Sequence, residues 1–346
     1  MKKISEFGIL IAVLAATTFA TTVQAKDILV INSFGGSYEK KHRELVITPF
    51  EEKYNVEVKV ITAYSSDTLA QLRAQKQNPQ FDVVHFSGGL ETAAASEGLL
   101  EPIKPEELSN HSQMYPFAVE GISKGIGPMY KTAVIGLLYN TEKISSPPTS
   151  WKDLAKTDYA DHVLITDAAS NTYGMLGMLM INKVNGGDLD NIEPGLAFVK
   201  KLLPTSTIVS KSPQIQQNFA QGNSWIAPYA QDYAFTLTKA GLPVKFTLPE
   251  EGGVVAPITV NLVAGRPNRN LALKFIDFSL RAEASRGWAE AMRYSPTNKT
   301  VKLADDVASQ VTYGEEQAKK LVSFDANKIA ANRPGWNESW SRAIAK

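Results

Sequence analysis

Residues 27–37 of the chain read DILVINSFGGS, and residues 81–90 read FDVVHFSGGL. Each stretch is a short apolar run that ends in a pair of glycines and leads into a helical pattern. Such a run is typical of a strand that is buried on both faces of a sheet. The two stretches therefore predict an α/β fold with glycine loops at equivalent strand ends, where open sheets of this class form their clefts.

Strands and helices alternate through the rest of the chain, as this fold class requires. The first series is predicted at 27–32, 37–54, 56–61, 67–76, 81–86 and 90–97. The second is predicted at 133–139, 163–166, 171–184, 191–203, 213–221, 225–228, 244–248 and 260–263. A long helical pattern over 271–292 is broken near Arg281. The restart after Tyr130 indicates a second unit of the same class.

Length and composition exclude several classes of protein. The chain has 346 residues, which is more than one hydrophobic core usually organises, so two domains are expected. The net charge is +1 and no basic stripe stands out, which argues against binding to nucleic acid. Cysteine is absent, so disulfides, thiol catalysis and thiolate metal sites are excluded together.

The first 25 residues have the pattern of a signal peptide. Lys2 and Lys3 precede an apolar run over 7–20, and residues 23–25 read VQA, with small residues at the two positions that a signal peptidase recognises. The run is shorter than the ~20 residues of a membrane-spanning helix. We expect cleavage after Ala25 and, since no cysteine is available for a lipid anchor, a location in the periplasm.

Five short segments in one order resemble a known family. They are PTSWKDL at 148–154, LITDA at 164–168, AGLPVKF at 240–246, LPEEGG at 248–253 and RYSPTN at 293–298. Together they are similar to segments of the periplasmic spermidine/putrescine-binding proteins of ABC importers and their broader relatives, which bind iron and other solutes. The resemblance extends from about residue 26 to residue 299.

The resemblance implies the two-lobed periplasmic binding protein fold of type II. Each lobe would be a central sheet flanked by helices, and two crossing strands near 130–134 and 256–261 would join the lobes. Residues 26–132 plus 259–346 would form lobe one, and residues 133–258 would form lobe two. Such a protein captures a small polar solute between the lobes and delivers it to a permease and ATPase complex. It is expected to be a monomer without cofactor or catalytic residues.

The two glycine loops are the first candidates for ligand contact. Backbone N–H groups at the start of a helix attract anionic or polar oxygen atoms. The alternative is that the glycines only permit two tight turns. Neither loop has the spacing or the Lys-Ser/Thr pair of a P-loop. The candidate contacts in the loops are Ser33, Phe34, Gly35, Gly36 and Ser37, followed by Ser87, Gly88 and Gly89.

The positions that hold the amine in polyamine binders have lost their acids here. Read without gaps, the two carboxylates after the TD strand end fall on Ala168 and Asn171. The tryptophan and aspartate after the EGG turn fall on Ala256 and Ile258. A buried ammonium without a carboxylate or other strong acceptor costs several kcal/mol. These replacements therefore argue against a simple polyamine, although Asn171 remains a candidate contact.

Other residues can compensate for part of this loss. The cleft tryptophan of the family falls on Ala230, beside which Tyr229 can substitute. A replacement acid is supplied by Asp232 or by Asp167, each of which can also be a structural acid at a helix start or strand end. Ser87 is retained.

An arginine is gained beside a retained aromatic residue. Arg293 stands where the polyamine binders carry glycine, next to the retained Tyr294. A guanidinium at a cleft edge suits a carboxylate or a phosphate-like group, and the alternative is a solvated charge at a helix end. The exchange of acids for an arginine predicts a ligand with an anionic group: a zwitterion, a carboxylate, or a phosphonate or phosphate.

Three alternatives remain open. Spermidine or putrescine is the first, and a ferric site at Tyr229 and Tyr233 is the second, since ferric-binding relatives use paired tyrosines. The third is an exported α/β enzyme with Asp167 and Asp232 as a carboxylate pair. No nucleophile elbow is present, and the histidines show no spacing typical of metal ligands. These are His42, His85, His111 and His162.

Overall fold

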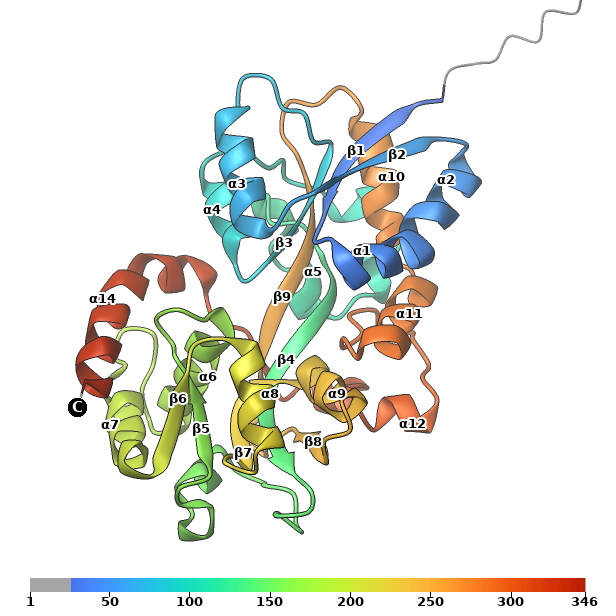
Figure 1. Cartoon of the computed structure of the whole chain (residues 1–346). Coiled ribbons are helices and arrows are strands. Elements are labelled where there is room, and N and C mark those ends of the chain that lie inside the picture. The colour runs from blue at the N-terminus through green and yellow to red at the C-terminus, as the bar shows by residue number, and fades with distance from the viewer. Residues whose placement is uncertain (1–25, 346) are drawn as a thin grey trace, which may run out of the picture.

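In the computed structural model, which describes residues 26–345, two long strands cross the middle of the molecule (Figure 1). They are β4 (Met129–Asn140) and β9 (Gly253–Leu262), and they pair antiparallel with each other. Both belong to a sheet of strand order β2-β1-β3-β9-β4-β7-β5-β6. The crossing strands expected at 130–134 and 256–261 are these two. The predicted signal peptide at 1–25 lies outside the described residues.

Lobe one is built around three parallel strands on one side of the crossing pair. They are β1 (Ile28–Ser33), β2 (Glu57–Thr62) and β3 (Val83–Ser87), and β3 pairs antiparallel with β9. One face is covered by α1 (Gly36–His42), a π-helical turn over 43–47, α2 (Thr48–Tyr54), α10 (Arg269–Ser279) and α11 (Ala282–Met292). The other face is covered by α3 (Ser65–Ala74) and α4 (Leu90–Ser96). A short helix, α5 (Pro116–Val119), precedes β4.

Lobe two extends the sheet from the other side of the crossing pair. Its strands are β5 (Val163–Thr166), β6 (Ser206–Val209), β7 (Ile226–Ala230) and β8 (Val244–Thr247). Its helices are α6 (Thr172–Val184), α7 (Glu193–Leu202), α8 (Ser212–Ala220) and α9 (Gln231–Lys239). One buried cluster unites these elements, and α6 lies at its centre with nine buried residues in a row from Gly174 to Asn182. The predicted α/β class is confirmed in both lobes.

The C-terminal segment returns to lobe two. It contains α12 (Asp305–Ala308), α13 (Glu315–Ala318), β10 (Leu321–Val322) and α14 (Ala326–Ile344). Trp336 and Trp340 of α14 lie in the core cluster of lobe two, and the indole N–H of Trp340 donates to Asp167 Oδ1 at 2.8 Å. The lobe limits at 132/133 and 258/259 stay a prediction. Within them α14 departs from the expected grouping, because its apolar face packs on lobe two.

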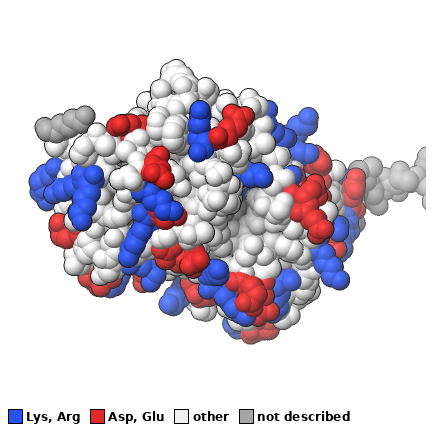
Figure 2. All heavy atoms as spheres, turned by 90° about the horizontal axis from the view of Figure 1, so that it is seen from below, with Lys and Arg blue, Asp and Glu red and all other residues white. Residues whose placement is uncertain are grey.

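The surface carries both signs of charge. On the face that Figure 2 shows, which is the side of lobe two seen from below, Lys and Arg are interspersed with Asp and Glu. This distribution agrees with the low net charge of +1 and offers no basic field to a nucleic acid on that face. Among residues 26–345, no helix combines the length and hydrophobicity that spanning a bilayer would need.

Gly127, which lies just before β4, allows the chain to approach β9 closely, and a substitution at this position tests that contact. Gly127 donates its N–H to Asn261 Oδ1 at 2.8 Å, and a Cβ at this position would overlap the carbonyl oxygen of Val260. We expect Gly127→Ala to lower the free energy of unfolding by about 2 kcal/mol, since the backbone must move apart. Urea unfolding measures this change.

The matched control is Gly335→Ala in α14, where an added Cβ would meet no atom within 4 Å. Alanine is the better helix former by about 1 kcal/mol, so this variant should unfold at the same or a higher urea concentration. Equal effects of the two substitutions would contradict the proposed role of the close approach at Gly127.

Candidate functional site

A buried lysine lies on the crossing strand β4. Lys131 pairs with Ile258 of β9, after a bulge between Met129 and Lys131. Its side chain is fully buried, and its Nζ has no hydrogen-bond partner among the described residues. Paired residues of antiparallel strands project to the same face of the sheet. The lysine therefore projects on the face of Ile258, a position where the resemblance to polyamine binders implies an acid.

Four aromatic rings surround this ammonium group. Lys131 Nζ lies 2.8 Å from the ring centroid of Trp288, 4.1 Å from Tyr38, 4.6 Å from Tyr130 and 4.8 Å from Tyr294. We call these four rings the cage. Tyr38 comes from α1, Trp288 from α11 and Tyr294 from the segment just after it, so lobe one supplies three walls.

The cage stabilises the ammonium less than water would. A desolvated cation–π contact contributes about 2 kcal/mol, whereas removing an ion from water costs several kcal/mol. Burial accordingly holds the pKa of Lys131 well below its usual range. A charged lysine in this position is short of an anionic partner.

Asp232 faces the cage from lobe two. It lies in the first turn of α9, its side chain is half-buried, and its Oδ1 has no hydrogen-bond partner among the described residues. Burial raises the pKa of Asp232 to about 7, and the charge of Lys131 opposes this rise. No ion pair within 4.0 Å joins the two groups in the described part of the chain.

The two glycine loops lie at the ends of β1 and β3, as expected. Gly35 and Gly36 have φ of +76° and +56°, and Gly88 and Gly89 have φ of +79° and +89°. These backbone conformations favour glycine over other residues. A Cβ on Gly88 would lie 3.4 Å from Thr172 of α6, so the second loop contacts lobe two.

The other loop residues contact their own lobe. Ser33 Oγ lies 3.3 Å from His42 Nδ1, and the ring of Phe34 lies 4.9 Å from that of the cage residue Tyr38. Ser37 is exposed. The N–H of Ser87 donates a hydrogen bond to Ser65 Oγ of α3 at 2.9 Å.

Asn171 and Tyr229 are held by contacts within lobe two. Asn171 caps α6, because its Oδ1 accepts from the N–H groups of Tyr173 and Gly174 at 2.9 and 3.2 Å. The hydroxyl of Tyr229 lies 2.6 Å from Ser212 Oγ. The ring of Tyr229 packs edge-on against Tyr173, whose pKa is raised by burial and by the nearby charge of Asp232.

Arg293 and Tyr294 point to different surroundings although they are adjacent. Tyr294 is part of the cage. The guanidinium of Arg293 donates to Gln310 Oε1 at 3.0 Å and to the carbonyl of Ala289 at 3.2 Å, and it lies 4.3 Å from the ring of Phe235. Arg293 thus closes the C-terminal end of α11, with φ of +59°. These contacts of Arg293 are all within the protein. The basic side chain that is fully buried beside the cage is Lys131, which the sequence analysis did not single out.

Side chains that the enzymatic and ferric alternatives would use form hydrogen bonds within the protein. Asp167 accepts hydrogen bonds from Ala169 N at 2.9 Å, Ser170 Oγ at 2.7 Å and Trp340 Nε1 at 2.8 Å. The hydroxyls of Tyr229 and Tyr233 both contact Ser212. Within residues 26–345, no group of three or more His, Cys, Asp or Glu side chains could hold a metal ion.

Known proteins resemble the chain along most of its length. Residues 46–314 match the family model described as bacterial extracellular solute-binding protein. The spermidine/putrescine-binding periplasmic protein of Salmonella typhimurium is 26% identical over 276 residues, which cover 76% of this chain and 77% of that protein. The gamma-aminobutyric acid-binding protein of Pseudomonas aeruginosa is 23% identical over 294 residues, covering 81% and 80%.

Solved structures share the fold. A putative extracellular solute-binding protein from Bordetella parapertussis superposes with a TM-score of 0.84 at 21% identity, covering 92% of this chain and 99% of that one. An ABC transporter protein from Clostridium perfringens superposes with a TM-score of 0.80 at 24% identity, covering 92% and 100%. These similarities confirm the predicted two-lobed periplasmic binding protein fold.

The electrostatic coupling between Lys131 and Asp232 can be measured as a change in the pKa of Asp232. In Lys131→Met, the ammonium that favours the ionised carboxyl is gone, so we expect the pKa of Asp232 to rise above its value of about 7. Carbon-detected NMR titration of the side-chain carboxyls measures it, with Asp232→Asn to assign the signal. Lys143→Met, at an exposed lysine, should leave the titration unchanged. An unchanged or lower pKa in Lys131→Met would contradict the coupling.

Proposed function

The chain belongs to the family of bacterial extracellular solute-binding proteins, and on this basis we propose that its ligand is a small solute with an anionic group. A protein of this family serves an ABC transporter as its periplasmic solute-binding component. We further propose that the solute binds between the lobes at the cage, and that the mature protein begins after Ala25 and acts as a monomer. Delivery would be to a permease and ATPase complex.

The position of Lys131 carries the proposal. In the polyamine binders that the chain resembles, the position of Ile258 supplies an acid that holds an amine. Here Ile258 is apolar and its partner in the neighbouring strand is a buried lysine. The acid that would favour a ligand ammonium is therefore absent at this point of the cleft. Burial lowers the pKa of Lys131, and the anionic group of a ligand would raise that pKa again and pair with the charged lysine.

A zwitterion fits both unpaired charges best. Its anionic group would pair with Lys131 and relieve the cost of burying that ammonium, and its amino group would pair with Asp232. The charges come from different parts of the molecule, since Lys131 lies on a crossing strand and Asp232 on α9 of lobe two. A ligand held by both would tie lobe two to the cage and favour the closed arrangement of the lobes.

The relatives support an amino acid-like ligand without deciding it. One relative at 23% identity binds gamma-aminobutyric acid, which is a zwitterion, and others at 26% identity bind spermidine or putrescine. Polyamine binding is therefore the alternative that the experiment must separate. The ferric and enzymatic alternatives are not favoured, because the hydroxyls of Tyr229 and Tyr233 and the carboxylate of Asp167 are engaged within the protein.

Titration calorimetry of the mature protein tests the proposal. The ligands are 4-aminobutyrate, 2-aminoethylphosphonate, putrescine and spermidine. We expect one of the two zwitterions to bind more tightly than either polyamine. Lys131→Met should weaken zwitterion binding by at least about 30-fold, since a buried charge partner is worth 2 kcal/mol or more. Lys143→Met is the matched control and should bind like the wild type.

Two results would overturn the proposal. The first is tighter binding of putrescine or spermidine than of either zwitterion by the wild type. The second is zwitterion binding that survives in Lys131→Met. A thermal-shift screen over amino acid derivatives and phosphonates extends the search, because a ligand raises the melting temperature in proportion to RT ln(1 + [L]/Kd).

A further inference from the structure

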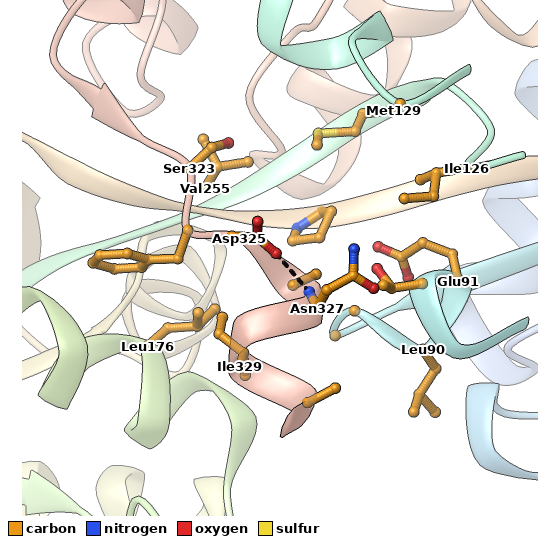
Figure 3. A pocket seen from close by; sticks show the side chains of 18 of the residues that line it. Leu90, Glu91, Ile126, Met129, Leu176, Val255, Ser323, Asp325, Asn327 and Ile329 are labelled. Atoms are coloured by element: carbon orange, nitrogen blue, oxygen red, sulfur yellow. Dashed lines mark hydrogen bonds between the residues drawn. The ribbon is translucent and has the colours of Figure 1, made fainter. Parts of the chain in front are cut away.

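A cavity of about 570 Å³ lies on the other face of the crossing strands from the cage. Its walls come from α4 of lobe one, from α6 and α14, and from β4 and β9 (Figure 3). Successive residues of a strand project to opposite faces. Val255 and Pro257 of β9 line the cavity, whereas Ile258 lies on the face of Lys131. The cavity and the cage are thus separate spaces with the crossing strands between them.

Most of the lining is apolar. Phe117, Met129, Met175, Leu176 and Phe324 contribute to it. The volume lies within the range of roughly 300–1,000 Å³ that is typical of small-molecule sites. A cavity of this size exceeds the need of a single ion and suits a molecule with an apolar body.

One buried acid lines this apolar cavity. Glu91 belongs to the first turn of α4, is 2% exposed, and has no hydrogen-bond partner for its Oε2 among the described residues. Figure 3 shows its carboxyl turned toward the space between α4 and the start of α14. Burial raises the pKa of Glu91 to about 7, although backbone N–H groups of Gly89 and Glu91 oppose the rise. A buried carboxylate oxygen without a donor is costly, and a ligand donor to Oε2 would offset that cost.

The other charged residues of the cavity balance one another. Glu120 and Lys124 come from the segment before β4, and Asp325 and Arg333 come from the C-terminal segment. Glu120, Lys124 and Asp325 are exposed, and Asp325 accepts the N–H groups of Asn327 and Lys328 as the cap of α14. Arg333 is half-buried. The charges of these two acids and two bases cancel, so Glu91 is the one charged residue of the described lining without a counterpart of opposite sign.

We propose that this cavity is a second ligand site, which takes a small organic cation with an apolar body and a primary ammonium group held by Glu91. The ammonium has three N–H donors and can satisfy the unpartnered carboxylate oxygen. The apolar body would contact the methionine, leucine and phenylalanine side chains. Gly88 and Gly89 of the second glycine loop also line this cavity. The proposed site does not depend on the function proposed for the cage, because Glu91 and the apolar lining are not part of the cage.

Phenethylammonium is a suitable probe, with 2-phenylethanol and 3-phenylpropionate as neutral and anionic analogues. Calorimetry on the mature protein should show saturable binding of the ammonium compound with one site, and weaker binding of both analogues. Glu91→Gln should weaken the binding at least tenfold. Glu120→Gln, at an exposed acid of the same cavity, should change it less than twofold.

The pH dependence gives a second readout with a defined sign. Only the ionised carboxylate pairs with the ammonium, and the pKa of Glu91 is about 7. The wild type should therefore bind phenethylammonium about tenfold more weakly at pH 6 than at pH 8, and this difference should disappear in Glu91→Gln. The other charged groups that line the cavity are Glu120, Asp325, Lys124 and Arg333.

Two further variants separate the proposal from its rivals. Ala330→Trp, at an exposed position of α14 that lines the cavity, should block the probe without touching Glu91. Asp232→Asn, in the cleft, should leave probe binding unchanged. The proposal is overturned by any of three results: no saturable binding, tighter binding of 3-phenylpropionate, or binding that is lost in Asp232→Asn but kept in Glu91→Gln. Melting curves of each variant confirm that it is folded.

Discussion

The antiparallel pair of β4 and β9 is the constraint on which the rest of the structure depends. It joins the sheets of both lobes, since β9 pairs with β3 and β4 pairs with β7. It also carries side chains to both faces: Lys131 into the cage, and Met129 and Val255 into the cavity. Because a strand alternates its side chains, a shift of one residue would exchange the two sets. The bulge before Lys131 is therefore as important for the site as the residue itself.

The cage is the physical basis of the ligand that we propose. Its four aromatic rings surround a cationic group that belongs to the protein itself. Cation–π contacts of about 2 kcal/mol do not replace the hydration of an ammonium. The pKa of Lys131 is lowered for this reason, while that of Asp232 is raised. Both groups are poised to gain a partner, which is a physical reason to expect a ligand with two opposite charges.

The sequence was sufficient to predict most of the strands, the glycine loops and the crossing segments, because each depends on local pattern or on segments shared with a family. It predicted neither β6 nor β10. It could not reveal Lys131, whose neighbours Trp288 and Ile258 are remote in the chain and are brought together only by strand pairing. Arg293, which is adjacent to Tyr294, donates to a carbonyl of α11, and its contact with a ligand stays a prediction. The sequence also could not foresee that Asp167 bonds to Trp340, 173 residues away, and so fixes α14 to lobe two.

The route of the chain through the crossing strands has a consequence for how the protein folds. In lobe one, β3 pairs with β9 on the side of the crossing strands. The side chain of Asn261 in β9 donates a hydrogen bond to the carbonyl of Val84, which lies 177 residues earlier in the chain. The first 128 residues therefore cannot complete their own sheet when they leave the ribosome, since the strand that closes it is made much later. Such long-range pairing slows folding. Lobe one therefore completes its sheet only after residues 253–262 have been synthesised, and such a delay would favour the unfolded state that export across a membrane requires.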